Sequence, residues 1–396
     1  MAWGYGTASD ATVRDLTTVG VGGTALRVRI SNVFGNEPLA IGAASVGFDA
    51  GGPAVVPGTL HQLLFSGKRG VTVPVGGLVY SDPVAIAVQD MQVLAVSLFV
   101  RNADLVTEHP CCTQVVSYFT SNGGGNLTGS LTGVGLTTSS PWERWVDAVD
   151  VLQTTGRGSI VVIGDSITDG FNATLRWTHV LQQRIDTLPP SEQRAVVNEG
   201  ITANALTSVV PTDSATGGGP SGLSRLGQDA IDQAGVSEVV LFLGTNDLWF
   251  GATSEQLIAG YQNAISEVRK GGLRIVAVTL LSRFSSREER WTAFQQAEMA
   301  QVNRWILTSG SFDGVLNLAP AVADIYNGAC DPDRLFPAYD SGDHLHPDAA
   351  GLVAMANAID PAVLDLPPLP REPQLVEVTP TPRCESTRAP SGGGRG

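Results

Sequence analysis

The chain has 396 residues, of which 43% are hydrophobic and 16% charged, and its formal net charge is −14. This length favours two domains, and the composition is typical of a folded globular protein. The acidic balance and the lack of a Lys/Arg cluster argue against nucleic acid as a partner, and no apolar run is long enough to span a membrane.

Residues 1–150 are predicted to form an all-β domain. The stretch ALRVRISNV (25–33) alternates apolar and polar residues, and LAVSLFVRN (94–102) is a second strand candidate. Between these two segments, Gly and Pro residues interrupt the apolar stretches, and few residues follow a helical periodicity. This pattern predicts an antiparallel β-sandwich of the jelly-roll kind.

Residues 151–362 show a different pattern, in which short buried strands alternate with helices. The strand candidates are 159–164, 195–200, 237–244 and 273–281. The helix candidates are 174–185, 222–235, 253–272, 287–310 and 347–360. Such alternation predicts a parallel sheet with helices on both faces. The proline-rich segment 363–396 is predicted to be an extended and partly disordered tail.

Candidate site residues, polar except for one glycine, follow the predicted strand ends or precede the last helix. They are Ser166, Gly200, Asn204, Asn246, Asp343 and His346. Because the carboxyl ends of parallel strands meet at one edge of a sheet, we expect these residues to converge on one cleft.

This set of residues fits acyl transfer. Ser166 would be the nucleophile, His346 the base that takes its proton, and Asp343 the carboxylate that orients the imidazole. The backbone N–H groups of Ser166 and Gly200 and the side-chain amide of Asn246 would form an oxyanion hole.

Structural roles are the alternatives for these residues. Ser166 would serve only as a helix cap, Gly200 as a turn residue and Asn246 as a second cap. Asn204 would either orient its loop or line the cleft, and His344 would either line the cleft or be exposed. A metal site would need further ligands beside the two histidines, so we expect neither a metal nor a cofactor.

The blocks GDSIT, NEGITAN, GTND and DHLH, in this order, resemble the four sequence blocks of the SGNH (GDSL-type) serine hydrolases. The resemblance covers roughly residues 159–360. It implies a flavodoxin-like α/β/α fold, with Ser166, Gly200, Asn246 and His346 as the four name-giving residues and Asp343 as the triad acid. The whole chain also resembles the two-domain bacterial branch of this family, in which a β-sandwich precedes the hydrolase domain.

The resemblance implies a serine esterase that cleaves carboxylic esters through an acyl-enzyme, with short acyl chains favoured. A carbohydrate acetyl- or feruloyl-esterase is one alternative, and a non-catalytic carbohydrate-binding protein with a vestigial site is another. The substrate would be a small-molecule or polymer-attached ester.

Location and disulfide bonding are further expectations. The related branch is usually exported, so we expect a location outside the cytoplasm after removal of an export signal, with a cytoplasmic location as the alternative. Cys330 and Cys384 would then pair, or all four cysteines, including Cys111 and Cys112, would be free thiols.

Overall fold

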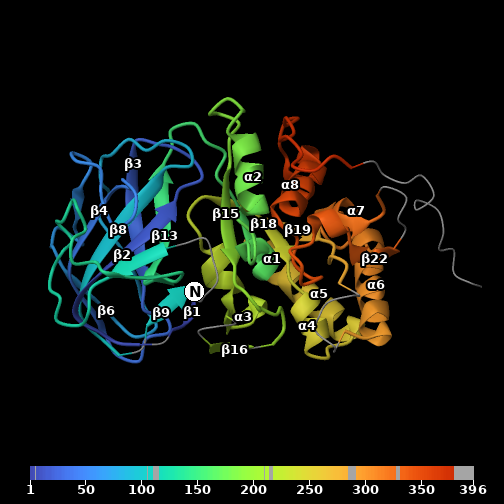
Figure 1. Ribbon diagram of the computed structural model, residues 1–396, viewed down its shortest axis with the longest axis horizontal. Helices are drawn as coiled ribbons and strands as arrows, with labels where there is room; N and C mark the ends of the chain where they lie inside the picture. The colour runs from blue at the N-terminus through green and yellow to red at the C-terminus, as the bar shows by residue number, and fades with distance from the viewer. Residues whose placement is uncertain are drawn as a thin grey trace, which may run out of the picture.

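The computed structural model describes residues 1–4, 6–104, 106–109, 116–208, 210–213, 217–283, 291–326 and 331–378. An all-β region lies beside an α/β domain, with the N-terminal region in blue and cyan in Figure 1. All four cysteines lie outside the described residues, so their pairing stays a prediction.

The N-terminal β region, as we call strands β1 to β13, ends at Leu152, and the next strand begins at Ser159. Its strands are β1 (Ala2–Trp3), β2 (Ala8–Thr18), β3 (Ala25–Ser31), β4 (Leu39–Phe48), β5 (His61–Leu63), β6 (Val71–Val73), β7 (Leu78–Tyr80), β8 (Val93–Ala103), β9 (Thr107–His109), β10 (Val116–Phe119), β11 (Thr138–Ser140), β12 (Glu143–Arg144) and β13 (Val146–Leu152). The largest sheet has the order β11-β10-β2-β8-β4-β5, with β6 also on β4, and a second sheet has the order β13-β3-β7. All pairings in both sheets are antiparallel, as predicted for a sandwich.

The alternation in β3 explains how these two sheets pack. Leu26, Val28 and Ile30 are buried in a core that they share with apolar residues of β8. Arg27 and Arg29 point to the other face, where they pair with aspartates of β13. A strand with this period of two has one face for the core and one for polar contacts.

The C-terminal α/β domain is built on a parallel sheet. Its strands are β14 (Ser159–Gly164), β15 (Ala195–Gly200), β18 (Val236–Phe242), β19 (Arg274–Val278) and β20 (Gly314–Leu316). They lie in the order β15-β14-β18-β19-β20, which is the flavodoxin-like order 2-1-3-4-5. Two antiparallel pairs lie outside this sheet: β16 (Val210–Asp213) with β17 (Gly217–Gly219), and β21 (Ala323–Asp324) with β22 (Asp331–Leu335).

Helices connect these strands. The α-helices are α1 (Ser166–Asp169), α2 (Trp177–Ile185), α3 (Gly222–Leu226), α4 (Thr245–Trp249), α5 (Ser254–Lys270), α6 (Ala293–Thr308), α7 (Ala319–Val322) and α8 (Ala349–Ala358). A π-helical turn (Gly227–Ile231) and two 3₁₀ turns (Pro337–Tyr339 and Pro361–Leu364) complete the domain. Both long helices, α5 and α6, begin with a capping box, made by Thr253 with Gln256 and by Thr292 with Gln295.

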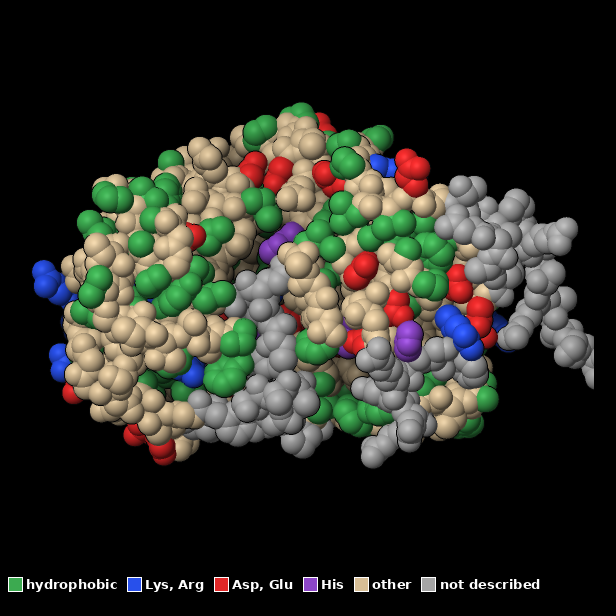
Figure 2. Space-filling view, in the orientation of Figure 1, with side chains coloured by type: hydrophobic (Ala, Val, Ile, Leu, Met, Phe, Trp, Pro, Cys, Tyr) green, Lys and Arg blue, Asp and Glu red, His purple; other side chains and the backbone are tan. Residues whose placement is uncertain are grey.

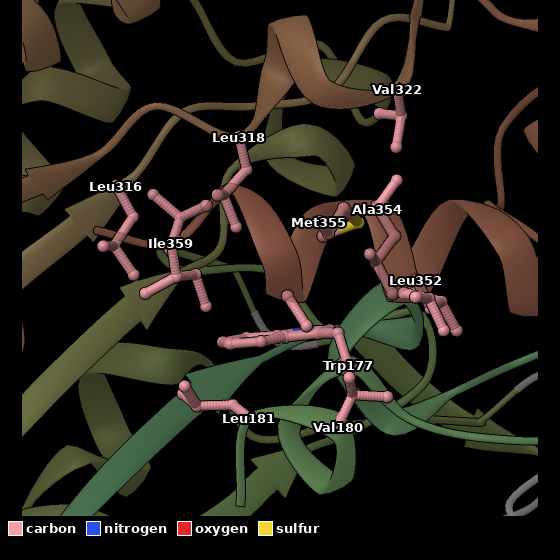
Figure 3. Packing of buried hydrophobic residues seen from close by; sticks show 14 of the residues in the cluster. Trp177, Val180, Leu181, Leu316, Leu318, Val322, Leu352, Ala354, Met355 and Ile359 are labelled. Atoms are coloured by element: carbon pink, nitrogen blue, oxygen red, sulfur yellow. The ribbon is translucent and has the colours of Figure 1, made fainter. Parts of the chain in front are cut away.

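Strand β14, which leads to Ser166, is buried on both faces. Ile160 and Val162 belong to a core with α2 and α8, where Trp177 packs against the apolar residues of α8 (Figure 3). Val161 and Ile163 belong to a second core, which contains residues of α5 and α6. The domain therefore has three layers, and its sheet positions polar residues at the carboxyl ends of the strands.

The start of the proline-rich tail differs from the prediction. Residues 366–378 belong to no helix or strand, but Leu366 is buried and Leu369, Val376 and Val378 pack on the core of α2 and α8. The Glu372 N–H also donates to Asn357 Oδ1 at 2.9 Å. The apolar residues that lie between the prolines, together with this hydrogen bond, hold the segment on the α/β domain. Within the described ranges, no helix has both the length and the hydropathy that a membrane span requires.

Candidate active site

Ser166 lies at the carboxyl end of β14, as the first residue of α1. The cap of this helix is Asp165, whose Oδ1 accepts a hydrogen bond from the Ile167 N–H at 3.0 Å. Ser166 is therefore not the capping residue that the structural alternative required. Complete burial raises the pKa of Asp165 to about 6.

The structure brings Ser166, His346 and Asp343 together in one hydrogen-bonded chain. His346 Nε2 lies 2.8 Å from Ser166 Oγ, and His346 Nδ1 lies 2.6 Å from Asp343 Oδ2. Ser166 and His346 are 180 positions apart, so the fold and not the local sequence makes this contact. A serine hydroxyl, an imidazole and a carboxylate in this order can transfer a proton from the hydroxyl to the imidazole.

The carboxylate of Asp343 is surrounded by donors. Its Oδ1 accepts hydrogen bonds from the N–H groups of Leu345 (3.0 Å) and His346 (2.8 Å). Its Oδ2 also accepts from Asn172 Nδ2 at 3.0 Å. Partial burial raises the pKa of Asp343, but the hydrogen bonds and charge of His346 outweigh it and hold the pKa well below its usual range. Asp343 is therefore ionised over the pH range in which a histidine titrates.

Gly200 is not placed as predicted. Its N–H donates to Asn198 Oδ1 at 2.9 Å, so it is already used within β15. A side chain at this position would collide with the Asp169 backbone, with a Cβ only 2.4 Å from its nitrogen. A glycine is therefore needed at position 200 because β15 packs closely against α1, and its N–H is not directed at the candidate site.

The turn after Gly200 holds a residue that the sequence analysis missed. Ala203 has φ +64°, a left-handed conformation that is rare for alanine. The turn is closed by the Asn204 N–H, which donates to Ile201 O at 3.0 Å. Among the described residues, none accepts a hydrogen bond from the Ala203 N–H.

Asn246 and Asn204 are in direct contact. Asn246 Nδ2 donates to Asn204 O at 2.8 Å, which leaves its second hydrogen for another acceptor. Asn246 is the second residue of α4 and is not its cap, which is Gly244.

Asn204 orients its loop and does not line the cleft with its side chain. The side chain is fully buried, donates to Pro220 O at 2.7 Å and accepts from Arg225 Nε at 3.1 Å. Of the two roles considered for it, the structure thus supports the first.

The two histidines of DHLH bind different aspartates. His344 Nδ1 lies 2.5 Å from Asp340 Oδ2, whereas His346 pairs with Asp343. The side chain of His344 is 45% exposed, so it lies at the surface. Within the described part of the chain, no group of three or more His, Cys, Asp or Glu side chains could hold a metal ion.

Two further aspartates brace the loops around Ser166. Asp247 accepts from the N–H groups of Leu206 (2.7 Å) and Thr207 (2.8 Å). Asp169, at the end of α1, accepts from the N–H (3.2 Å) and hydroxyl (2.7 Å) of Thr202. Complete burial raises the pKa of Asp169 to about 7, although the nearby Arg176 charge opposes this.

The N-terminal β region contacts the residues that brace the Ser166 loops through His109 in β9. Its Nε2 donates to Gly200 O at 2.7 Å and lies 3.9 Å from Asp169 Oδ1. Burial lowers the pKa of His109 to about 3, so the ring is neutral and Nε2 carries its hydrogen. No sequence signal marked this residue, because the two partners are 91 positions apart.

A cavity of about 600 Å³ lies between β13 and β15, with His109, Asp169 and Arg176 in its wall. Figure 2 shows the hollow between the N-terminal β region and the α/β domain from outside. Ser166 and His346 do not line it, so this cavity is separate from the candidate site.

The comparison with family models decides the classification. Residues 162–353, which include Ser166, Asn246, Asp343 and His346, match the GDSL-like Lipase/Acylhydrolase family. This part of the chain is a GDSL-like lipase/acylhydrolase domain. The resemblance found in the sequence is thereby confirmed, and the N-terminal β region lies outside the matched residues of the acylhydrolase domain.

Solved structures similar to this chain include several esterases and lipases. The lipase/acylhydrolase from Enterococcus faecalis is 20% identical, with a TM-score of 0.41, and the match covers 55% of this chain and 99% of that one. A GDSL-like lipase from Bacteroides thetaiotaomicron is 16% identical, with a TM-score of 0.40, over 53% and 89% of the two chains. Axe2, an acetylxylan esterase from Geobacillus stearothermophilus, is 18% identical, with a TM-score of 0.38, over 52% and 94%. No curated protein matches the chain.

Proposed function

We propose that this protein is a serine esterase that hydrolyses carboxylic esters through an acyl-enzyme on Ser166. The observation that carries the proposal is the chain of two hydrogen bonds, 2.8 Å from Ser166 Oγ to His346 Nε2 and 2.6 Å from His346 Nδ1 to Asp343 Oδ2. It joins a nucleophile, a base and an orienting carboxylate inside a domain of an acylhydrolase family.

In the first half of the reaction, Ser166 Oγ attacks the ester carbonyl carbon while its proton passes to His346 Nε2. Asp343 holds the imidazole with its proton on Nδ1 and stabilises the imidazolium that forms. The imidazolium then protonates the leaving alcohol, and the acyl group stays on Ser166.

The negative charge on the tetrahedral intermediate needs donors that are already in position. We assign this role to the Ser166 N–H and to the second hydrogen of Asn246 Nδ2. The N–H of Ala203 takes the place that the sequence analysis gave to Gly200, because the Gly200 N–H donates to Asn198 while no described residue accepts from Ala203.

In the second half, His346 takes a proton from water, which attacks the acyl carbon and releases the acid. Ser166 recovers its proton from His346, so the enzyme returns to its starting state with no cofactor in the cycle. Ser166 is only 6% and His346 only 7% exposed. The preference for short acyl chains comes from the family resemblance, and the acyl chain must reach these two buried side chains.

The same geometry favours catalysis over a purely binding role. In a purely binding site, the hydrogen bonds that join Ser166, His346 and Asp343 would serve no purpose. The same holds for the N–H donors that surround the Asp343 carboxylate. An esterase that acts on carbohydrate-linked acyl groups stays within the proposal, since the leaving alcohol is not specified by these three residues.

The test is hydrolysis of p-nitrophenyl esters from acetate to palmitate by wild type, Ser166→Ala and the surface control Ser121→Ala. We expect wild type and Ser121→Ala to cleave the short esters best and Ser166→Ala to fall to the background rate. Substantial hydrolysis by Ser166→Ala would exclude the mechanism, and equal rates on acetate and palmitate would exclude the preference for short chains.

A further inference from the structure

We propose that Asn172 is a positioning residue for the ester hydrolysis proposed above: its amide holds the Asp343 carboxylate against His346. Asn172 Nδ2 donates to Asp343 Oδ2 at 3.0 Å, the oxygen that also accepts from His346 Nδ1 at 2.6 Å. The chain of contacts then runs Asn172, Asp343, His346, Ser166. The inference rests on the proposed function, because it assigns a role within that reaction.

Asn172 is the one donor to Asp343, among those the structure describes, that comes from outside the loop of Asp343 itself. The other three donors are the N–H groups of Leu345 and His346 and the His346 ring, all within three residues of Asp343. Those bonds would survive if the whole loop moved away from Ser166. The bond from Asn172 would not, since Asn172 lies only six residues after the nucleophile.

The neighbouring residue contacts the other half of the same pair. The rings of Phe171 and His346 lie 4.7 Å apart and are tilted by 54°. Phe171 thus packs beside the imidazole while Asn172 binds the carboxylate. Both follow Gly170, the left-handed cap (φ 91°) at which α1 ends. The end of the nucleophile helix therefore fixes both members of the Asp–His pair.

The backbone at Asn172 explains why an asparagine is suited to this position. Its φ is +58°, in the left-handed region where Asn, Asp and Gly are the residues that occur with least strain. A glycine here keeps the backbone path and removes the amide. An aspartate keeps the size and replaces the donor with a negative charge. Together, these two substitutions distinguish the effect of losing the hydrogen bond from the effect of disturbing the backbone turn.

The hydrogen bond matters chemically because the Asp343 side chain is 29% exposed. Without Asn172, water competes for Oδ2, and the carboxylate is free to turn away from the His346 Nδ1–H. The imidazole would then spend less time with Nε2 directed at Ser166. Such a loss lowers kcat and leaves KM unchanged, since Asn172 is assigned no contact with substrate.

A carboxylate at position 172 would also change the pH profile. Among the described residues, the carboxylates of Asp343 on its own loop and of Asp165 at the start of α1 interact electrostatically with His346. A third negative charge would favour the imidazolium over the neutral base. The acid limb of kcat/KM would therefore move to higher pH. A residue that only shapes a surface turn would not produce this shift.

The experiment compares Asn172→Gly, Asn172→Asp and Ser166→Ala with wild type on p-nitrophenyl acetate between pH 5 and 9. Asp10→Gly is the matched control, because Asp10 is a left-handed residue (φ 44°) in the N-terminal β region. We expect Asn172→Gly to lose about tenfold in kcat at constant KM, the lower range for a hydrogen bond to a charged group. Asn172→Asp should lose more, with its acid limb shifted upward by about one pH unit. Asp10→Gly should behave as wild type.

Two outcomes would overturn the inference and leave the esterase proposal intact. In the first, Ser166→Ala is inactive while both Asn172 variants match wild type. In the second, both variants lose activity with an unshifted pH profile and a lowered unfolding temperature, as a structural residue would. Activity in Ser166→Ala would instead reject the proposed function itself.

Discussion

The imidazole of His109 donates from Nε2 to the carbonyl oxygen of Gly200 at 2.7 Å, which ties the N-terminal β region to the strand end beside Ser166. The same ring lies 3.9 Å from Asp169, the last residue of the nucleophile helix. Asp169 in turn binds Thr202, in the loop that leads to Ala203. The N-terminal β region is thereby part of the support of the candidate site.

Replacing His109 tests this link. His109→Ala removes a buried hydrogen bond and leaves the Gly200 carbonyl without its donor, so we expect a loss of about 1–2 kcal/mol in the free energy of unfolding. The activity on p-nitrophenyl acetate should fall with it. His109→Gln, which keeps a side-chain N–H, should lose less. His61→Ala, on strand β5, is the control, and a His109→Ala protein with the stability and kcat of this control would show that the link is unimportant.

The two Asp–His pairs of the DHLH loop give a matched test of the triad acid. Asp343→Asn would leave the imidazole in the wrong tautomer, so we expect kcat to fall by roughly 10⁴. Asp340→Asn changes the partner of His344, which lies at the surface, and should cost far less. Steady-state kinetics on one short ester distinguishes them. Similar losses in both variants would contradict the assignment of Asp343.

Replacing Ala203 tests the assignment of its N–H, instead of the Gly200 N–H, to the oxyanion hole. Glycine has no Cβ to strain the left-handed backbone at this position, so Ala203→Gly should raise the free energy of unfolding by up to about 1 kcal/mol. The N–H is retained, and kcat/KM should stay near the wild-type value. Denaturant unfolding and kinetics measure both effects. A clear loss of stability would mean that the turn is not held in this conformation.

The raised pKa of Asp169 predicts that the free energy of unfolding depends on pH. This pKa is about 7 in the folded protein, because of burial, against about 4 for an unfolded aspartate. Between these values the folded state holds a proton on Asp169 that the unfolded chain has lost, so the contribution of Asp169 to the free energy of unfolding is largest below pH 4 and decreases as the pH rises towards 7. Denaturant unfolding at several pH values should show this contribution as a difference in slope between wild type and Asp169→Asn. An unchanged slope in this variant would refute the assignment.

The sequence predicted the fold class and most of the site because both depend on local patterns. Runs of apolar residues followed by Gly-Asp-Ser or Gly-Thr-Asn-Asp mark buried strands that end in polar loops. Strand ends of a parallel sheet then converge on one edge, so Ser166 follows β14 and Asn246 follows its neighbour β18, and the fold brings the Asp343–His346 loop to Ser166.

The errors arose where tertiary packing decides the role of a residue. A glycine after a strand is compatible with an exposed N–H, but Gly200 is needed for close packing on α1, and the left-handed turn occurs three residues later, at an alanine. Asn172 and His109 carried no signal because their partners are 171 and 91 positions away. The expected export of the protein stays a prediction of the family resemblance.

The most direct test of the central claim is to locate the covalent adduct left by a serine-directed phosphonate ester. The account predicts that intact-protein mass spectrometry of wild type shows one adduct, that peptide mapping places it on Ser166, and that Ser166→Ala shows none. Labelling should also slow strongly in His346→Ala, which lacks the base. An adduct at another residue, or an unmodified wild-type protein that still hydrolyses esters, would contradict the account.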